Sequence, residues 1–252
     1  MQGTLRVEHA EISLLGGRED NQDRISTVVS GESALLIVVD GMGGHAHGAK
    51  AAEVTRRVMV ELFAATAQPI FDPLGFLHLA LGRAHEEVVR IGLGLPMEQR
   101  PRATCAVCLI QNNSAWWAHI GDSRIYLLRG GNVATRTRDH SHVELLLREG
   151  LITPELAQTH PMRNYVECCV GGDDIMPDMT LSPRIPLRTN DVLLVCSDGF
   201  WASLSEVAIA GALCTLTLPI SETLQALGQR AIKNAGAASD NTSAIALRWL
   251  TA

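Results

Sequence analysis

Strand-like and helix-like segments occur in separate groups along this chain of 252 residues, and this grouping restricts its fold more than any other feature. Short runs rich in β-branched and apolar residues predict strands at 25–29, 34–39, 104–110, 115–120, 125–128, 192–196 and 243–249. Two longer segments, 48–65 and 73–92, carry apolar residues at helical spacing instead. Because strands and helices do not alternate one by one, the pattern predicts an α+β fold with helices covering an antiparallel core.

The rest of the chain adds shorter elements and no sign of a second domain. Helices are predicted at 142–149, with Ser141 as the N-cap, at 154–159 and at 221–234. The turn Gly130-Gly131-Asn132 favours an antiparallel hairpin. No Pro-, Gly- or Ser-rich linker, repeat or low-complexity tract divides the sequence, so we expect one domain over residues 1–252. Periodicity leaves open whether the strands form one sheet or two.

Composition excludes several classes of protein. With 46% hydrophobic and 19% charged residues, the chain can bury a substantial core and is not expected to be disordered. A net charge of -6 and the absence of a Lys/Arg block argue against a nucleic-acid partner. No apolar run approaches the ~20 residues that cross a bilayer, and the N-terminus does not resemble a signal peptide. We therefore expect a cytoplasmic protein without membrane insertion.

The six cysteines are expected to be reduced in that compartment. Cys105 and Cys108 have the spacing of a metal-binding pair, but both lie in the predicted strand 104–110. Residues three apart on a strand point to opposite faces, so we expect these two side chains to pack in the core.

Four aspartates lie at the ends of predicted strands: Asp40, Asp122, Asp198 and Asp240. A carboxylate in such a place needs a partner, which is either a backbone donor in a turn or a metal ion. The glycine after Asp40 and the one after Asp198 allow the backbone to come close to a bound ion. Oxygen ligands favour Mg²⁺ or Mn²⁺. Zinc is a weaker alternative, because His45 and His47 lack an evident third His or Cys ligand.

Seven short motifs follow one another in a specific order: Arg18-Glu-Asp-Asn-Gln-Asp23, Asp40-Gly-Met-Gly-Gly-His45, Ala103-Thr104, Gly121-Asp-Ser-Arg124, Asp139-His-Ser141, Ser197-Asp-Gly199 and Ser239-Asp-Asn241. Together they resemble the metal-dependent protein phosphatase family, the type 2C serine/threonine phosphatases, and especially its compact bacterial branch. The resemblance extends over about residues 8–249. It implies a four-layer α-β-β-α sandwich, in which two antiparallel sheets are flanked by helix pairs and a dinuclear metal site lies at one edge.

The resemblance also implies a flap subdomain over about residues 140–180. Bacterial relatives often carry a helix, a Gly-Xaa-Ile-Thr turn and a second helix there, and Gly150-Leu-Ile-Thr153 matches that turn. The following stretch, Arg163-Asn-Tyr-Val-Glu-Cys-Cys-Val-Gly171, departs from the Thr-Arg-Ala-Leu-like run of typical members. The substrate preference of other flaps therefore does not transfer to this chain.

Metal-binding roles follow from the resemblance position by position. Asp40 would bridge two Mn²⁺ or Mg²⁺ ions, and the Gly41 carbonyl would bind one of them. Asp198 and Asp240 would hold the other ion. Asp122 resembles the family's ligand for a weaker third ion, shared with Asp198.

Three further residues complete the implied site. Asp23 would lie at the second ion or in its water shell, Arg18 would clamp the substrate phosphate, and Asn241 would orient Asp240. Two cations ~3.5–4 Å apart lower the pKa of a bridging water and provide hydroxide for in-line attack on phosphorus. This chemistry needs no cysteine nucleophile, and none of the six cysteines lies in a Gly-rich Cys-Xaa5-Arg loop.

Two positions in the site motifs differ from the family pattern. Gln22 stands where many relatives have Glu, which predicts weaker binding of the second metal ion. Met42 stands where eukaryotic members place a His proposed as the general acid. Protonation of the leaving group would then fall to water or to His45.

The sequence therefore leads to one main hypothesis and two alternatives. The main hypothesis is a monomeric serine/threonine protein phosphatase whose substrates include a bacterial Ser/Thr kinase and the targets of that kinase. The first alternative is a catalytically weak phosphoprotein-binding regulatory module on the same fold. In the second alternative the four aspartates are turn residues without a shared role.

Overall fold

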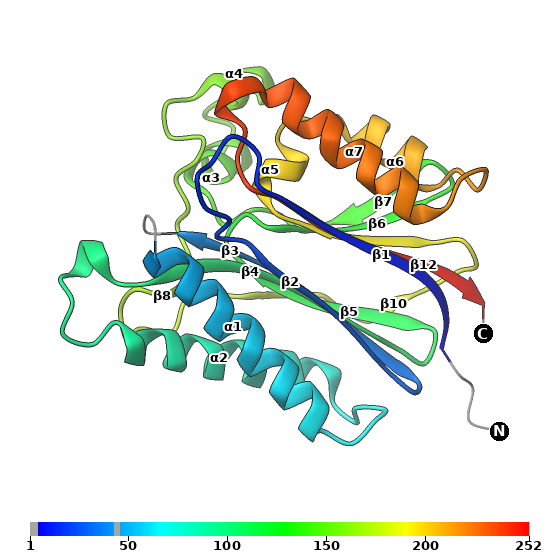
Figure 1. Cartoon of the computed structure of the whole chain (residues 1–252), viewed down its shortest axis with the longest axis horizontal. Coiled ribbons are helices and arrows are strands. Elements are labelled where there is room, and N and C mark those ends of the chain that lie inside the picture. The colour runs from blue at the N-terminus through cyan, green and yellow to red at the C-terminus, as the bar shows by residue number, and fades with distance from the viewer. Residues whose placement is uncertain (1–4, 43–45, 252) are drawn as a thin grey trace.

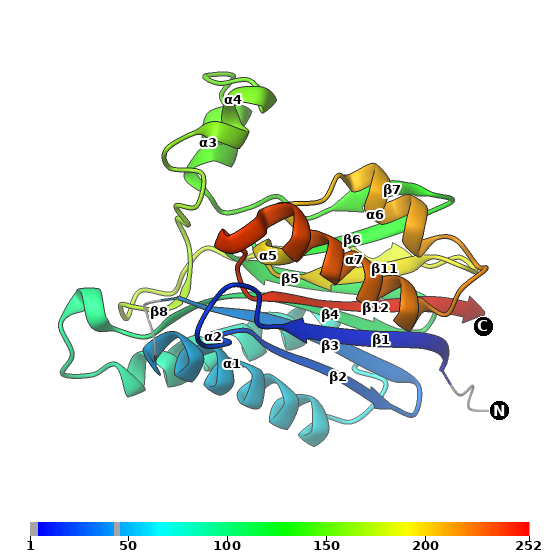
Figure 2. The ribbon, with the colours of Figure 1, turned by 45° about the horizontal axis from the view of Figure 1, so that its top comes forward.

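The computed structural model describes residues 5–42 and 46–251, which form two antiparallel sheets packed face to face between layers of helices (Figures 1 and 2). The first sheet has the strand order β1 (Arg6–Leu14), β12 (Thr242–Thr251), β11 (Val192–Cys196), β6 (Arg124–Arg129) and β7 (Asn132–Arg136). The second has the order β10 (Ile185–Pro186), β5 (Ser114–Ile120), β4 (Arg102–Gln111), β3 (Ser33–Met42) and β2 (Arg24–Ser30). Two short strands join it, with β8 (Val170–Gly171) on β4 and β9 (Thr180–Leu181) on β5.

Helices cover the outer face of each sheet. Helices α1 (Ala46–Ala65) and α2 (Pro73–Ile91) pack on the second sheet, and α6 (Glu206–Leu213) and α7 (Ile220–Ala235) pack on the first. The short helix α5 (Asp198–Trp201) lies at one end of α7, and the 3₁₀ turns are Met97–Gln99 and Gly236–Ala238. The predicted four-layer α-β-β-α architecture is confirmed.

The alternation of side chains along each central strand produces three buried clusters. On β3, Leu35 and Ile37 face the α1–α2 layer, while Leu36 and Val38 face the other sheet. A strand that is covered on both faces has a continuous run of apolar residues in its sequence. This is why residues 34–39 were recognisable as a strand. Cys105 and Cys108 on β4 divide in the same way, one into each cluster, so their predicted packing role is confirmed.

Several elements differ from their predictions. Strand β3 continues through Asp40 to Met42, because Asp40 pairs with Thr104 and Met42 with Arg102. Strand β1 was not predicted, since it lies at the edge of its sheet and carries the exposed charged residues Arg6 and Glu11. Helix α6, which begins after the N-cap Ser205, has apolar residues on nearly all sides and no clear helical period.

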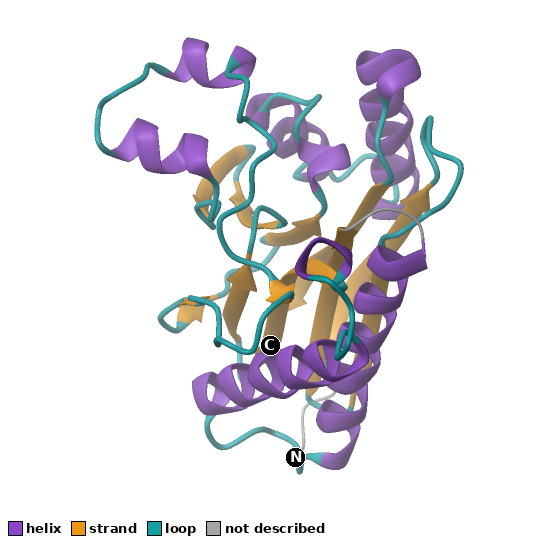
Figure 3. Cartoon of the chain, turned by 90° about the vertical axis from the view of Figure 1, so that its left-hand side faces the viewer, coloured by secondary structure: helices purple, strands orange, loops and turns teal. Residues whose placement is uncertain are grey.

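Two helices of the segment 140–180 stand away from the layers. Helices α3 (His142–Arg148) and α4 (Pro154–Thr159) project beyond the sheets at one end of the molecule (Figures 2 and 3). The Oγ of Ser141 accepts a hydrogen bond from the N–H of Glu144 at 3.3 Å, which confirms the predicted N-cap. Within the described ranges, no helix is long and apolar enough to span a bilayer.

Candidate active site

Five segments that are distant in sequence meet at one end of the sandwich. They are the β1–β2 loop, the last residues of β3, the β5–β6 turn, the start of α5 and the residues just before β12. Together with two residues from the segment after α4, they surround a cavity of about 570 Å³. Its described lining residues are Gly17, Arg18, Glu19, Asp20, Gln22, Asp40, Gly41, Met42, Asp122, Asn164, Val166, Asp198, Asp240 and Asn241. All the predicted metal-site residues except Asp23 therefore line one cavity, which argues against four unrelated turn residues.

The cavity carries a strong excess of negative charge. Acidic side chains dominate its lining, and among the described residues that line it Arg18 is the one basic side chain. Burial, followed by repulsion from Asp23 and Asp198, holds the pKa of Asp40 well above its ordinary value. Burial and repulsion from Asp240 raise the pKa of Asp198 to about 6, although the backbone N–H of Gly199 opposes this shift. These carboxylates need a nearby cation to be ionised together.

Asp122 lies in the tight turn between β5 and β6 and is 8% exposed. Burial, with repulsion from Asp198 and Asp139, holds its pKa well above the ordinary value. The turn is fixed by several contacts. The Trp201 indole donates a hydrogen bond to the Asp122 carbonyl oxygen at 3.0 Å, and the hydroxyls of Thr104 and Ser123 lie 2.7 Å apart.

Asp23 lies beneath the cavity rather than on its surface. Its side chain is 3% exposed, and its Oδ2 accepts a hydrogen bond from the Ser197 hydroxyl at 2.8 Å. Burial and repulsion from Asp198 raise the pKa of Asp23 to about 7, although hydrogen bonds from serine hydroxyls oppose the shift. Asp23 is thus adjacent to Asp198 through Ser197, in a position to act on the site indirectly.

Arg18 and Asp240 form an ion pair at the rim of the cavity. The Arg18 Nη2 donates to the Asp240 Oδ2 at 2.6 Å, and the Arg18 side chain is 58% exposed. This hydrogen bond, together with the charge of Asp240, raises the pKa of Arg18. A guanidinium so placed is available to an anion that enters the cavity.

Asn241 orients Asp240 as predicted, but through its backbone N–H, because its side chain has other partners. The side chain holds the β1–β2 loop, since its Nδ2 donates to the carbonyl oxygens of Leu15 and Asp20 at 2.9 and 3.0 Å, and its Oδ1 accepts from the N–H of Gln22 at 2.9 Å. Asp240 is oriented by the backbone, because the N–H of Asn241 donates to its Oδ1 at 2.8 Å. The reason is geometric: Asn241 immediately precedes β12, which pairs with β1, and β1 leads into the loop that carries Arg18.

Gly41 is required by a close approach between two segments. A Cβ at this position would lie 2.3 Å from the carbonyl oxygen of Gly48 in α1 and 2.9 Å from that of Gln22. Only glycine allows α1 to begin directly over the end of β3. The backbone at Asp40 is thereby held against the helix, with Gly41 among the residues that line the cavity.

The donor set fits divalent ions of the Mg²⁺ or Mn²⁺ type. The buried Oδ1 atoms of Asp23 and Asp198 have no hydrogen-bond partner among the described residues. No His or Cys from the described ranges lines the cavity, so its ligands are oxygen atoms, which zinc sites seldom use alone. In the same ranges, no three acidic, His or Cys side chains converge closely enough to enclose one ion by themselves. This fits Mg²⁺-type sites, where one or two carboxylates share the ion with water.

Two features of the site were not predicted from the sequence, and one prediction falls outside the described residues. Asn164 and Val166, from the segment after α4, line the cavity. The unusual composition of residues 163–171 was the only sequence signal that pointed to these two residues. Their position at the cavity depends on how that segment folds back. Met42 lines the cavity, whereas His45, the alternative proton donor, belongs to the undescribed residues.

Comparison with known sequences agrees with the geometry of this site. The Protein phosphatase 2C family model matches residues 15–235. The chain is 33% identical over 253 residues to protein phosphatase PhpP of Streptococcus pneumoniae, which covers 93% of this chain and 96% of the relative. It is 31% identical over 229 residues to serine/threonine protein phosphatase PstP of Mycobacterium tuberculosis, which covers 90% of this chain and 42% of that longer protein.

Comparison with solved structures leads to the same group. The crystal structure of the Mycobacterium tuberculosis serine/threonine phosphatase PstP/Ppp superposes with a TM-score of 0.83 at 30% identity, over 97% of this chain and 99% of the other. The catalytic domain of PstP in complex with two manganese ions superposes with a TM-score of 0.82 at 29% identity, over 98% and 100% of the two chains.

Proposed function

Since this chain belongs to the protein phosphatase 2C family and is a serine/threonine phosphoprotein phosphatase, we propose that it hydrolyses phosphoserine and phosphothreonine in proteins with the help of Mn²⁺ or Mg²⁺ bound in the acidic cavity. The resemblance stated from the sequence motifs is confirmed. The observation that carries the proposal is the convergence of Asp40, Asp122, Asp198 and Asp240 on one cavity beside Arg18. A relative of this fold has been solved with two manganese ions.

Each residue of the site has a proposed role. Asp40 would be shared between two ions and the Gly41 carbonyl would bind one of them, while Asp198 and Asp240 would hold the other. Asp122, with Asp198, would contribute to a third and weaker site. When bound, the ions supply an activated water and neutralise the charge of the phosphate. Asp23 supports Asp198 through the Ser197 hydroxyl.

Arg18 orients the phosphate so that the attacking water and the leaving oxygen lie in line. It is exposed enough to exchange its ion pair with Asp240 for contacts to the substrate. Met42 offers no proton at its position, so protonation of the leaving oxygen is assigned to water.

The biological setting is also a proposal. We place the enzyme in the cytoplasm as a monomer of one domain, with residues 140–180 as a flap beside the site. Its substrates would include a bacterial Ser/Thr kinase and the targets of that kinase. Asn164 and Val166 support the placement of the flap, because both line the cavity from that segment.

The direct test is hydrolysis of p-nitrophenyl phosphate and of a phosphothreonine peptide, with Mn²⁺ and with excess chelator. We expect turnover with Mn²⁺ and none with chelator. Equal activity in both conditions would contradict a metal-dependent site. No turnover, combined with tight binding of the phosphopeptide, would favour the regulatory module instead.

Arg18→Ala is expected to reduce kcat/KM for the phosphothreonine peptide about 10-fold or more, because a charge-assisted hydrogen bond to the phosphate is worth ~1.5–3 kcal/mol. Arg18→Lys should recover only part of the loss, since lysine keeps the charge but not the two-pronged geometry. Steady-state kinetics in saturating Mn²⁺ measure both variants. Arg57→Ala, on the exposed face of α1, serves as the control. A kcat/KM of Arg18→Ala equal to that of the control would remove Arg18 from the site.

A further inference from the structure

His140 connects three parts of the molecule that meet beside Asp122. It follows β7 and begins the segment that leads into α3. Its backbone N–H donates to the carbonyl oxygen of Gly121 at 2.9 Å, and its carbonyl oxygen accepts from the N–H of Glu167 at 2.8 Å. The outgoing and returning stretches of the flap are therefore joined at the residue that also contacts the Asp122 turn.

The Asp122 turn depends on an unusual backbone conformation at Gly121. Its φ is +98°, and a Cβ there would lie 2.6 Å from the side chain of Thr104. The N–H of Gly121 donates to the His140 Nδ1 at 3.3 Å. Together with the bond from the His140 N–H, this makes two contacts between His140 and the residue that immediately precedes Asp122.

The hydrogen bonds of the ring identify its tautomer. Because Nδ1 accepts from a backbone N–H, it carries no proton, and Nε2 then donates to the Thr180 hydroxyl oxygen at 2.8 Å. Burial lowers the pKa of His140, which favours this neutral form. The His119 ring stacks on the same side chain, with centroids 4.5 Å apart and planes at 26°. The ring is thus held in one orientation from several directions.

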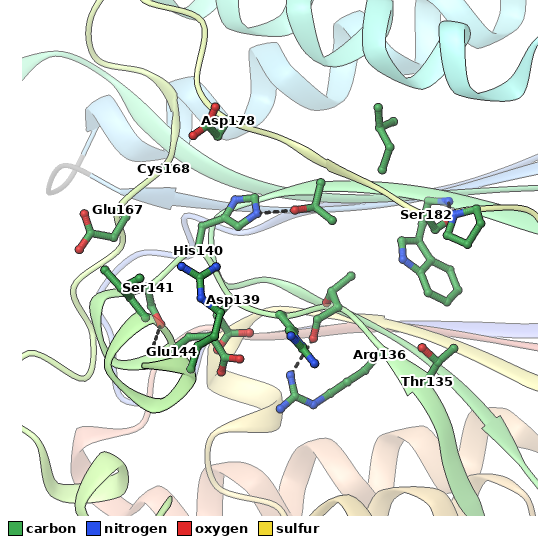
Figure 4. Close-up of a pocket in the computed structure, with 18 of the residues that line it drawn as sticks. Thr135, Arg136, Asp139, His140, Ser141, Glu144, Glu167, Cys168, Asp178 and Ser182 are labelled. Carbon is green, nitrogen blue, oxygen red and sulfur yellow. Dashed lines mark hydrogen bonds between the residues drawn. The ribbon is translucent and has the colours of Figure 1, made fainter. Parts of the chain in front are cut away.

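His140 also lies on the wall of a second cavity, of about 960 Å³, that is separate from the acidic one (Figure 4). In Figure 4 its ring extends between labelled Asp139 and Asp178, and a dashed line marks its hydrogen bond. The neighbours on its chain have other partners. Asp139 pairs with Arg124, and the Ser141 hydroxyl caps α3. Of residues 139–141, His140 is therefore the one whose side chain accepts a hydrogen bond from Gly121.

We propose that His140 is a positioning residue, whose Nδ1 lone pair holds the Gly121 N–H and so directs the Asp122 carboxylate toward its metal ion. The proposal rests on the proposed function in one respect, namely that Asp122 binds an ion needed for full turnover. Ligands in metal sites are oriented by such outer contacts, and losing one typically costs ~10–100-fold in metal affinity or activity. We expect loss of this contact to change kcat and the Mn²⁺ concentration for half-maximal activity rather than KM, because His140 does not line the acidic cavity.

Three variants separate the acceptor from the bulk of the side chain. His140→Leu removes both ring nitrogens, whereas the Oδ1 of His140→Asn can accept from Gly121 in place of Nδ1. Thr180→Val removes only the partner of Nε2. We expect His140→Leu to lower kcat about 10-fold and to raise the Mn²⁺ concentration for half-maximal activity about 10-fold, with KM within about 2-fold. His140→Asn should stay within about 3-fold of the parent in both quantities, and Thr180→Val closer still.

Two readouts do not need activity. Calorimetric titration with Mn²⁺ should show a weaker site in His140→Leu that is recovered in His140→Asn. Amide hydrogen exchange at Gly121 should be about 10-fold faster in His140→Leu alone. An inactive parent protein would contradict the proposed function while leaving these two measurements informative about His140.

The proposal is overturned if His140→Leu binds Mn²⁺ and turns over as the parent does, or if His140→Asn loses as much as His140→Leu. Should His140→Leu not fold, the nitrogen chemical shifts of the parent ring decide the matter. An unprotonated Nδ1 supports the assignment, and a protonated Nδ1 overturns it, because a protonated nitrogen cannot accept from Gly121.

Discussion

Asp40→Asn is expected to reduce kcat at least about 1,000-fold in saturating Mn²⁺ while making the metal-free protein more stable. The loss follows from removing the carboxylate assigned to both ions, since the metal site supplies the water and neutralises the phosphate. The gain follows from charge. Ionised Asp40 is disfavoured first by its burial and then by repulsion from Asp23, Asp198, Asp122 and Asp240, and a neutral amide relieves both effects.

Kinetics with p-nitrophenyl phosphate and thermal unfolding in excess chelator measure the two effects. We expect the Tm of Asp40→Asn to rise by about 3 °C in chelator at pH 7.5. Asp174→Asn makes the same chemical change at an exposed aspartate outside the cavity and should alter neither quantity. An Asp40→Asn protein with more than about one tenth of the parent kcat would rule out Asp40 as the bridging residue.

Removing the metal from the parent protein is expected to abolish turnover and to lower its stability. Mn²⁺ at about 100 times its Kd would stabilise the folded state by ~2.7 kcal/mol, which for a chain of this size corresponds to a Tm increase of about 5–10 °C. Asp40→Asn should show less than about half of this increase, because its site lacks one carboxylate. The same Tm with Mn²⁺ and with chelator would mean that the folded cavity binds no ion.

The size of this metal effect should depend on pH in a definite direction. The folded-state pKa is about 7 for Asp23 and about 6 for Asp198, both above the ordinary value of 3.8. At pH values between the ordinary pKa and these raised pKa values, the metal-free folded state binds more protons than the unfolded state. Its stability therefore falls as the pH rises from about 5 to about 7.5. Mn²⁺ should therefore raise the Tm more at pH 7.5 than at pH 5.5. Thermal scans at both pH values, with and without Mn²⁺, measure this difference.

Local patterns were sufficient for much of the fold. The continuous apolar run 34–39 indicated a buried central strand, because both faces of that strand are covered. The helical spacing of apolar residues in 73–92 indicated α2, because only one face of that helix is buried. Strand β1 and helix α6 were missed where that logic weakens. A half-exposed edge strand shows no clean alternation, and a nearly all-apolar helix shows no clear period.

The sequence likewise identified some residues of the candidate site and not others. Asp40, Asp122, Asp198 and Asp240 were identifiable because a carboxylate at the end of an apolar strand is costly without a partner. Asn164 and Val166 were not identifiable from the sequence, because no local sequence pattern marks them as neighbours of the cavity. Asn241 does contact Asp240, through its backbone N–H, but the sequence did not indicate that its side chain binds the loop that contains Asp20.

By itself the sequence determined the kinds of residue available to the site, the α+β class and the family, because each depends on which side chains occur in which order. The tertiary structure decided which of them meet. Arg18 and Asp240 are 222 positions apart and form an ion pair only because β1 and β12 are neighbours in one sheet. Likewise, His140 reaches Gly121 only because the chain folds back after β7. Strand order brings distant groups within a few ångströms, and periodicity carries no information about strand order.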